Sequence, residues 1–296
     1  MKVLITGASG FVGSHVVKEL FDNGYDIIAL SARKIPYINT IDSLNYEFDT
    51  SYLHNCCPDI ECIIHMGAFT PKAGGEANDI FRTTSNIRNT EKLLAAASKL
   101  DGLKKIIFIS TLDVYEEANG ALTEITPTIP QTMYGWSKLY CEQMIRTWAE
   151  QYQIQYEILR LGHVYGEGEE KYRKVMPVMI KDALSGKNII IYGDGEAVRT
   201  FIYVGDVAKA IRNAIRHSDS IIINIVGNES ITINQLAAMI VSISGSQVDI
   251  KHIHSDTPNR DIRFDNSKLM SSLLENLTEL EVGLKREITY MRERLS

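Results

Sequence analysis

The stretch "VLITGASGFVGSH" (residues 3–15) decides the fold, because three glycines, Gly7, Gly10 and Gly13, follow an apolar run and open a helical pattern. Glycine permits a tight turn and a close approach of the backbone to a ligand. The amino end of the following helix presents free N–H groups to an anion such as a pyrophosphate. In this context, the GxxGxxG spacing predicts a dinucleotide-binding turn.

The first half of the chain alternates short apolar runs with helical patterns. We expect strands at 2–6, 26–30, 61–68, 104–111 and from 155 onward, with helices at 12–24, 86–100 and 134–152. Continuous apolar runs indicate strands that are buried on both faces, and the alternation predicts a parallel sheet with helical crossovers. The expected fold class is therefore α/β, a doubly wound parallel sheet of the Rossmann type, with a smaller C-terminal substrate-binding lobe.

After Gly166 the alternation becomes irregular and the chain more polar. We expect residues 1–165 to form the dinucleotide-binding domain, to which residues 200–227 return. Residues 166–199 and 228–296 are expected to form the substrate-binding lobe.

Composition excludes several classes of protein. The net charge of −6, without a basic block, argues against a nucleic-acid partner. No run approaches the roughly 20 apolar residues that span a bilayer, so we expect a cytoplasmic protein without membrane contact. The four cysteines form no CxxC pair, which argues against a metal site or a disulfide framework.

The end of the second strand, "IIALSARK", bears on the choice of cofactor. Ser31 stands where a carboxylate would bind the adenine ribose, and Arg33 and Lys34 follow it. A missing carboxylate with cations beside it suits a 2′-phosphate. We therefore expect NADP to be preferred, with NAD as the alternative.

The stretch "QTMYGWSKLYCE" (131–142) places Tyr134 and Lys138 four residues apart, on one face of the expected helix. A free tyrosine has a pKa of about 10, too high for a base at neutral pH. A neighbouring ammonium favours the phenolate and lowers that pKa. The pair therefore predicts proton transfer at a substrate hydroxyl.

The chain resembles the extended short-chain dehydrogenases/reductases, in the branch of NAD-dependent epimerases and dehydratases that modify nucleotide sugars. Besides the glycine loop, the motifs "IIHMGA", "FISTLDVY", "YGWSK" and "RTFIYVGDVAKA" occur in the order typical of that family. The resemblance implies that Tyr134 and Lys138 form the catalytic YxxxK pair and that Thr111 supplies a third catalytic hydroxyl. The cofactor contacts that the glycine pattern, the "SARK" ending and the resemblance together suggest are Gly7, Ser9, Gly10, Phe11, Val12, Gly13, Ser31, Arg33, Asp49, Ala68, Asn86, Tyr134 and Lys138.

The resemblance also suggests how a nucleotide-diphosphate sugar is bound. Arg199 in "GEAVRTFIYV" and Arg260 in "TPNRDIRFDNSKL" match arginines that contact the diphosphate in relatives. His163 replaces an asparagine of the family pattern near the substrate. Lys72 and Asp113 are weaker candidates for contacts with the sugar.

The sequence identifies the reaction less clearly than the family. Dehydratases of this family carry an acidic pair after the threonine, whereas this chain has Leu112 and Asp113, which disfavours dehydration. Reduction of a 4-keto-6-deoxyhexose by NADPH is our main expectation, and an NAD-dependent nucleotide-sugar 4-epimerase is the alternative. A non-catalytic dinucleotide sensor is a minor alternative, because such proteins lose the tyrosine or the lysine and this chain keeps both. The resemblance further implies a homodimer formed through the helices at 86–100 and 134–152.

Overall fold

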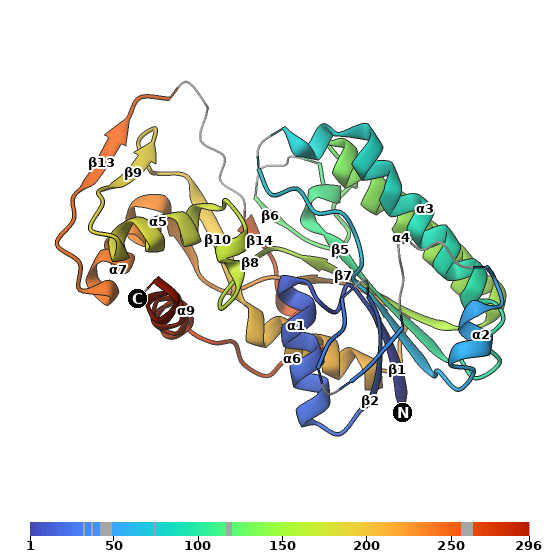
Figure 1. Ribbon diagram of the computed structural model, residues 1–296. Helices are drawn as coiled ribbons and strands as arrows, with labels where there is room; N and C mark the ends of the chain where they lie inside the picture. Colours follow the sequence, from blue (N-terminus) through green and yellow to red (C-terminus); the bar gives the residue numbers. More distant parts are fainter. Residues whose placement is uncertain are drawn as a thin grey trace.

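The computed structural model describes residues 1–31, 33–36, 38–41, 49–73, 75–116, 120–255 and 263–295. Its central element is a parallel sheet of seven strands (Figure 1). The strands are β1 (Lys2–Thr6), β2 (Asp26–Leu30), β3 (Asn39–Ile41), β4 (Cys62–His65), β5 (Lys105–Thr111), β7 (Gln155–Leu161) and β11 (Ile221–Ile225). Their order in the sheet is β11-β7-β5-β4-β1-β2-β3.

The sheet is doubly wound, because the chain builds outward from β1 in both directions. Val3 of β1 is paired with Ile27 of β2 on one side and with Cys62 of β4 on the other. The strand order therefore reverses between β1 and β4. In open α/β sheets, ligands bind outside the carboxyl ends of the strands at this point.

Helices cover both faces of the sheet. They are α1 (Phe11–Asp22), α2 (Tyr52–Cys56), α3 (Ile80–Ala97), α4 (Met133–Tyr152) and α6 (Val204–Arg216). Val3 and Ile5 belong to one core cluster with α1 and α6, whereas Leu4 belongs to a second cluster with α2, α3 and α4. Alternate residues of a strand point to opposite faces, so β1 is buried on both of them.

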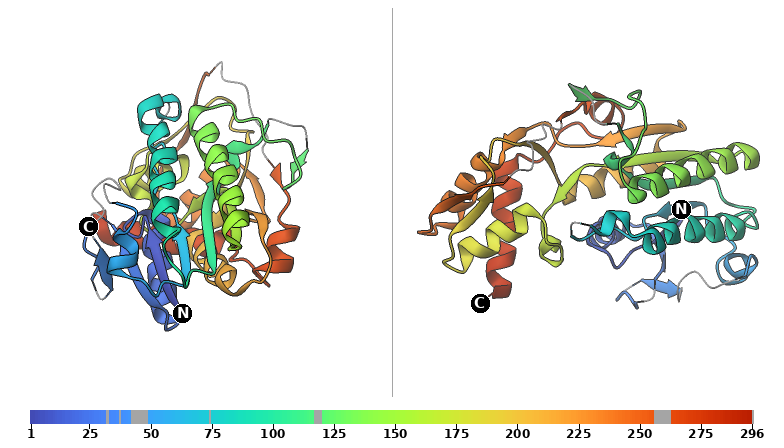
Figure 2. Two further views of the ribbon diagram at one scale, coloured as in Figure 1. Left: turned by 90° about the vertical axis from the view of Figure 1, so that its right-hand side faces the viewer. Right: turned by 90° about the horizontal axis from the view of Figure 1, so that it is seen from above.

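A smaller lobe lies beside the sheet and contains the C-terminal end of the described chain (Figure 2). Its strands are β8 (His163–Tyr165), β9 (Ile189–Tyr192), β10 (Val198–Tyr203), β12 (Ser230–Thr232) and β13 (Ile250–Ile253), with the short pair β6 (Ala121–Leu122) and β14 (Arg263–Phe264). Its helices are α5 (Val175–Leu184), α7 (Ile233–Ser244) and α9 (Leu280–Leu295), and α8 (Ser267–Ser272) precedes α9. The core cluster on the α1 side of the sheet continues into this lobe through α5, α7 and α9.

The expected fold class is confirmed, and the differences from the expected elements are local. Helix α3 begins at Ile80, six residues before the expected start, because the Asp79 side chain caps it by accepting the N–H of Arg82. Strand β3 and helix α2 were not expected. Helix α6 and strand β11 join the large sheet after an excursion into the smaller lobe. The exact domain boundaries stay a prediction. Within the described residues, no helix is long and apolar enough to span a bilayer.

Candidate functional site

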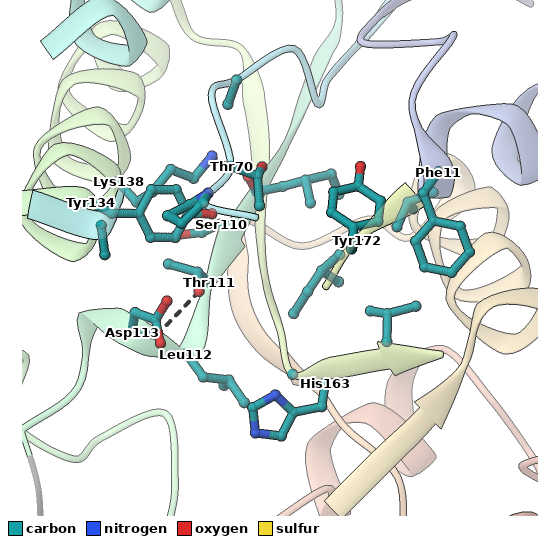
Figure 3. Close-up of a pocket in the computed structure, with 18 of the residues that line it drawn as sticks. Phe11, Thr70, Ser110, Thr111, Leu112, Asp113, Tyr134, Lys138, His163 and Tyr172 are labelled. Carbon is teal, nitrogen blue, oxygen red and sulfur yellow. Dashed lines mark hydrogen bonds between the residues drawn. The ribbon is translucent and has the colours of Figure 1, made fainter. Parts of the chain in front are cut away.

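A cleft of about 1430 Å³ opens at the carboxyl ends of the strands, between the sheet and the smaller lobe (Figure 3). Fourteen of the residues expected at the site line it. They are Gly7, Ser9, Gly10, Phe11, Val12, Gly13, Arg33, Ala68, Lys72, Thr111, Asp113, Tyr134, Lys138 and His163. The fold thus brings together residues that are up to 156 positions apart in the chain.

The glycine turn closes one end of the cleft. Gly7 has a φ of +72°, and a Cβ atom there would lie 2.7 Å from the backbone nitrogen of Gly67. A Cβ atom on Gly13 would overlap the carbonyl oxygen of Gly7. Among the described residues, no side chain caps helix α1 at Gly10. Only glycine fits this turn, and the resulting backbone cradle at a helix amino end fits the pyrophosphate of a dinucleotide.

Ser31 lies beside the glycine turn but does not line the cleft. Its hydroxyl is 3.3 Å from the Ser9 hydroxyl, to which it donates, and it accepts the backbone N–H of Arg33 at 3.1 Å. Ser31 is buried, whereas the Arg33 side chain is exposed and borders the cleft. Ser31 therefore holds the backbone at Arg33, whose side chain borders the cleft.

Two other expected cofactor residues lie outside the cleft lining. Asp49 is exposed and accepts hydrogen bonds from the hydroxyl and the backbone N–H of Ser51, which lower its pKa. Asn86 is buried in α3, where its side chain accepts the N–H of Phe69 at 2.7 Å and donates to the Phe69 carbonyl and to Ser137. Asn86 thus holds the loop after β4, and the ligand roles of both residues stay predictions.

Tyr134, Lys138 and Thr111 meet at the other end of the cleft. Thr111 ends β5, and α4 begins beside it with Thr132 as its cap, which accepts the N–H of Gly135. The Lys138 ammonium donates a hydrogen bond of 2.6 Å to the carbonyl oxygen of Ile109 and lies over the Phe108 ring. The cap and this hydrogen bond fix the first two turns of α4 against β5.

The pKa values at this end of the cleft differ from the sequence-based expectation. Burial raises the pKa of Tyr134, the Asp113 carboxylate raises it further, and the nearby hydroxyls of Thr70 and Thr111 lower it. Burial also lowers the pKa of Lys138 to about 8. In the protein without a bound cofactor, burial therefore keeps the pKa of Tyr134 above its usual value, and the lowering expected from Lys138 and a charged nicotinamide stays a prediction for the loaded enzyme.

The part of the cleft next to Thr111 contains Asp113 and His163. The backbone N–H of Asp113 donates to the Thr111 hydroxyl at 3.2 Å (Figure 3). Desolvation by the surrounding protein raises the pKa of Asp113, whereas a hydrogen bond with Thr111 and the charge of Lys174 lower it. His163 is exposed to the cleft, but desolvation by the protein around its ring, with Lys174 and Arg199, lowers its pKa to about 4, so the ring is neutral at pH 7. A neutral imidazole can both donate and accept a hydrogen bond.

The two expected diphosphate-binding arginines are placed differently. Arg199 is half-buried and does not line the cleft, and one of its Nη atoms donates to the Val198 carbonyl. Its charge nevertheless acts on His163. Arg260 lies outside the described residues. Their roles stay predictions.

Several residues that line the cleft were not expected from the sequence. They are Thr70, Ser110, Tyr172, Lys174 and Arg263, among others. Thr70 and Ser110 each stand next to or near a residue that was singled out, so their proximity in sequence is the signal that could have found them. Tyr172 and Lys174 lie in a polar loop without periodicity, and Arg263 follows the segment around Arg260.

A buried charge network lies behind Ser110. The Ser110 hydroxyl donates to Glu142 of α4, and Arg160 of β7 forms a bidentate pair with the same carboxylate at 2.7 and 3.1 Å. The Arg160 guanidinium also stacks on the Tyr115 ring. This network ties β5, α4 and β7 together directly beneath the end of the cleft that holds Tyr134 and Thr111. Among the described residues, no cluster of three or more potential ligands could hold a metal ion.

Comparison with known proteins gives matches along nearly the whole chain. The model of the "NAD dependent epimerase/dehydratase family" matches residues 3–226. A protein of Methanocaldococcus jannaschii, provisionally named a UDP-glucose 4-epimerase, is 31% identical over 303 residues, which cover 98% of each chain.

Solved structures agree with this result. The UDP-glucose 4-epimerase of Thermotoga maritima, determined with UDP-glucose, superposes with a TM-score of 0.90 at 28% identity. The UDP-glucuronic acid 4-epimerase of Bacillus cereus, determined with NAD, superposes with a TM-score of 0.86 at 28% identity. Both comparisons cover 100% of each chain.

Proposed function

Because the chain belongs to the NAD-dependent epimerase/dehydratase family, we propose that it is a UDP-sugar 4-epimerase. The observation that carries the proposal is the meeting of Thr111, Tyr134 and Lys138 in one cleft with the glycine turn. Similarity over the full length to two solved UDP-sugar 4-epimerases supports the reaction. This is the alternative that the sequence left open, and it has more support than the reduction of a 4-keto-6-deoxyhexose.

The proposed chemistry rests on proton transfer to and from the Tyr134 oxygen, which accepts the proton as a phenolate. Tyr134 takes the proton of the sugar C4 hydroxyl as the hydrogen on C4 leaves, and it returns that proton after the 4-keto sugar has turned over. Thr111 donates a hydrogen bond to the same sugar oxygen. NAD, when bound, supplies the acceptor and donor of the hydride and a positive charge that favours the tyrosine phenolate.

The hydrogen bond from Lys138 to the Ile109 carbonyl oxygen fixes the position of the ammonium. From this position, we propose, the ammonium contacts the nicotinamide ribose and acts on Tyr134. With a pKa of about 8, it carries its charge at neutral pH. We propose that it binds the cofactor and assists the ionisation of Tyr134 once the cofactor adds its positive charge.

We propose NAD as the cofactor that works in this cycle, because an epimerase returns the hydride that it removes. The NAD in the structure of the Bacillus cereus relative supports this choice. Ser31 and Arg33, which led to the expectation of NADP, are compatible with either cofactor: the serine hydroxyl can bind a ribose hydroxyl, and the arginine is exposed beside it.

The substrate that we propose is a nucleotide-diphosphate sugar. His163, Asp113 and Lys72 line the cleft and are proposed to contact the sugar or its phosphates. Arg199 and Arg260 are proposed to neutralise the diphosphate, because guanidinium groups bind phosphate bidentately. Leu112 stands where dehydratases of the family carry a carboxylate, which argues against elimination of water.

We propose a homodimer formed through α3 and α4. A shallow apolar groove of about 350 Å³ lies between these helices, and Ile87 and Met133 are among the residues that line it. Trp136 and Tyr140 are 49% and 58% exposed beside it. Leu139 and Trp148 of the same helix are buried and serve the core of the subunit.

The proposed function can be tested with purified protein and three sugar nucleotides. UDP-glucose and UDP-glucuronic acid should be converted to their C4 epimers without net consumption of dinucleotide, and the dinucleotide released by denaturation should be NAD. Stoichiometric oxidation of NADPH by a nucleotide-linked 4-keto-6-deoxyhexose, without epimerisation of either UDP-sugar, would contradict the proposal and favour the reductase.

A further inference from the structure

The loop between β8 and α5 (residues 166–174, the β8–α5 loop) crosses from the smaller lobe to the amino end of α1. His15 of α1 donates a hydrogen bond from Nε2 to the carbonyl oxygen of Glu167 at 2.8 Å. At Gly168, where φ is +96°, a Cβ atom would lie 3.6 Å from the Phe11 ring. The loop therefore lies against the same helix end that forms the dinucleotide cradle.

Tyr172 is the aromatic residue of this loop that borders the site. Its ring centroid lies 6.1 Å from that of Phe11, and the two side chains lie at the same end of the cleft (Figure 3). A hydrogen bond from the Phe11 backbone acts on the Tyr172 hydroxyl and lowers its pKa, against the effect of burial. Phe11 is the first residue of α1, so its N–H is one of those left free by the helix. Tyr172 also lines the cleft itself.

Two lysine ammonium groups lie near the Tyr172 ring, and that of Lys174 is also paired with the Glu169 carboxylate at 3.5 Å. The ammonium of Lys72, from the loop after β4, lies 5.8 Å from the ring centroid, and that of Lys174 lies 5.6 Å from it. These distances are within the range of cation–π attraction. Lys72, Lys174 and the positive end of α1 thus converge on one tyrosine, an arrangement that suits an anionic group beside its hydroxyl.

We propose that Tyr172 is a dinucleotide-binding residue supplied by the smaller lobe, and that its hydroxyl donates a hydrogen bond to a pyrophosphate oxygen at the amino end of α1. This inference rests on the proposed function only in requiring that the glycine turn binds a dinucleotide.

The chemistry of the phenol suits this role. A tyrosine hydroxyl is both donor and acceptor, so it can keep its contact with the Phe11 N–H while it donates to a phosphate oxygen. Burial raises the pKa of Tyr172, which keeps the donor proton in place at neutral pH. Because the tyrosine belongs to the second lobe, release of the dinucleotide requires the β8–α5 loop to move away from α1.

The test measures release of the dinucleotide, and no sugar nucleotide is present. Full-length wild-type protein and the Tyr172→Phe variant are loaded with the dinucleotide that the wild type binds more tightly, NAD or NADP. Each is then mixed with an excess of labelled dinucleotide, and the exchange rate is followed. Tyr192→Phe is the matched control, since Tyr192 is 73% exposed on β9 and does not line the cleft.

Loss of a hydrogen bond to a charged group should accelerate release from Tyr172→Phe roughly ten- to hundredfold, while Tyr192→Phe exchanges like the wild type. Unchanged or slower release from Tyr172→Phe would overturn the proposal. Acceleration seen only in Tyr172→Ala would also overturn it, because the ring and not the hydroxyl would then retain the cofactor. Tight dinucleotide binding without epimerisation of UDP-sugars would contradict the proposed function and leave this test intact.

Discussion

The Thr6 hydroxyl lies 2.7 Å from Nδ1 of His65, and this contact fixes the tautomer of a fully buried histidine. The Thr6 oxygen already accepts the backbone N–H groups of Met66 and Gly67, so its proton is directed to Nδ1. Nε2 of His65 must then carry the ring proton, which it donates to Thr90 at 2.9 Å. This directed chain joins β1, β4 and α3 at the point where the strand order reverses.

The first prediction concerns the pH dependence of this histidine. Burial, with a smaller effect of the Lys138 charge, lowers the pKa of His65 to about 3. Its ordinary pKa is about 6.5, so between these values the unfolded chain binds the proton and the folded chain does not. The stabilisation from neutral His65 is complete above pH 6.5 and is lost as the pH falls. The free energy of unfolding of wild type relative to His65→Gln should therefore drop by about 1.4 kcal/mol per pH unit below 6.5.

Urea denaturation of both proteins at pH 7.5, 6.5, 5.5 and 5.0 measures this difference. His54, which is exposed at the end of α2, offers a control in His54→Gln. A constant difference between wild type and His65→Gln across this range would show that His65 is protonated when folded or titrates normally.

The second prediction concerns Tyr134. Tyr134→Phe removes the proposed proton carrier and keeps the ring that fills the site. We expect kcat for epimerisation to fall by at least about a hundredfold, with NAD affinity unchanged within about a factor of two. Tyr152→Phe, on the exposed far end of the same helix, serves as the control. Turnover retained near the wild-type rate would remove Tyr134 from the reaction.

The third prediction concerns the choice between NAD and NADP. The Ser9 hydroxyl and the Arg33 N–H lie within hydrogen-bond range of the Ser31 oxygen, so both can support a carboxylate placed there. In Ser31→Asp, that carboxylate would bind ribose hydroxyls and repel a 2′-phosphate. The ratio of dissociation constants should shift towards NAD by about tenfold or more.

Fluorescence titration of the wild type and of the Ser31→Asp variant with NADH and NADPH gives this ratio. Ser218→Asp adds the same charge at an exposed position and should leave the ratio unchanged. An unaltered ratio in Ser31→Asp would mean that the end of β2 does not read the adenine ribose.

The fourth prediction concerns a buried carboxyl group in α9. Glu287 is fully buried, and neither of its carboxylate oxygens has a hydrogen-bond partner among the described residues. Burial, with Glu169 and Glu167 nearby, raises its pKa well above the ordinary value. The folded chain therefore keeps a proton that the unfolded chain releases above about pH 4.5, and stability falls as the pH rises from there.

Glu287→Gln removes the loss of stability at high pH, because the amide does not ionise and has nearly the same size as the carboxyl group. Its free energy of unfolding should exceed that of the wild type by about 1–3 kcal/mol at pH 8 and match it at pH 4.5. Glu281→Gln, exposed on the same helix, should show no such trend in chemical denaturation. Equal stability of the wild type and Glu287→Gln at both pH values would show that Glu287 ionises without cost.

The fifth prediction concerns assembly. Tyr140→Glu places a charge on the exposed apolar face of α4 and should convert a dimer into a monomer of about half the mass. Light scattering after gel filtration reports the mass directly. Tyr192→Glu, on an exposed strand of the smaller lobe, should keep the wild-type mass. A dimer that persists in Tyr140→Glu would place the interface elsewhere.

The sequence predicts those parts of the site that depend on local spacing. The roles of Gly7 and Gly13 can be predicted, because a strand–turn–helix without room for a Cβ atom requires glycine at fixed positions in the sequence. Tyr134 and Lys138 can be read because four residues make one helical turn. The expected fold follows from the same local alternation of apolar runs and helices.

What the sequence does not predict depends on contacts between distant segments. Tyr172 lies 161 positions from Phe11, in a loop whose polar residues carry no periodicity. The direction of the pKa shift at Tyr134 depends on burial, which is a property of the assembled cleft. Likewise, Arg199 was expected from a motif to bind phosphate, but the motif does not encode that it lies outside the cleft lining.

The return of α6 and β11 to the large sheet limits how this protein can be cut or recombined. A gene fragment that ends at residue 165 would encode a sheet without its β11 strand, leaving one edge of β7 unpaired and one face of the sheet without α6. Exposed strand backbones of this kind pair with other chains and aggregate. Chimeras that exchange the smaller lobe with that of a relative therefore need two grafted segments, with α6 and β11 kept from the parent that supplies the large sheet.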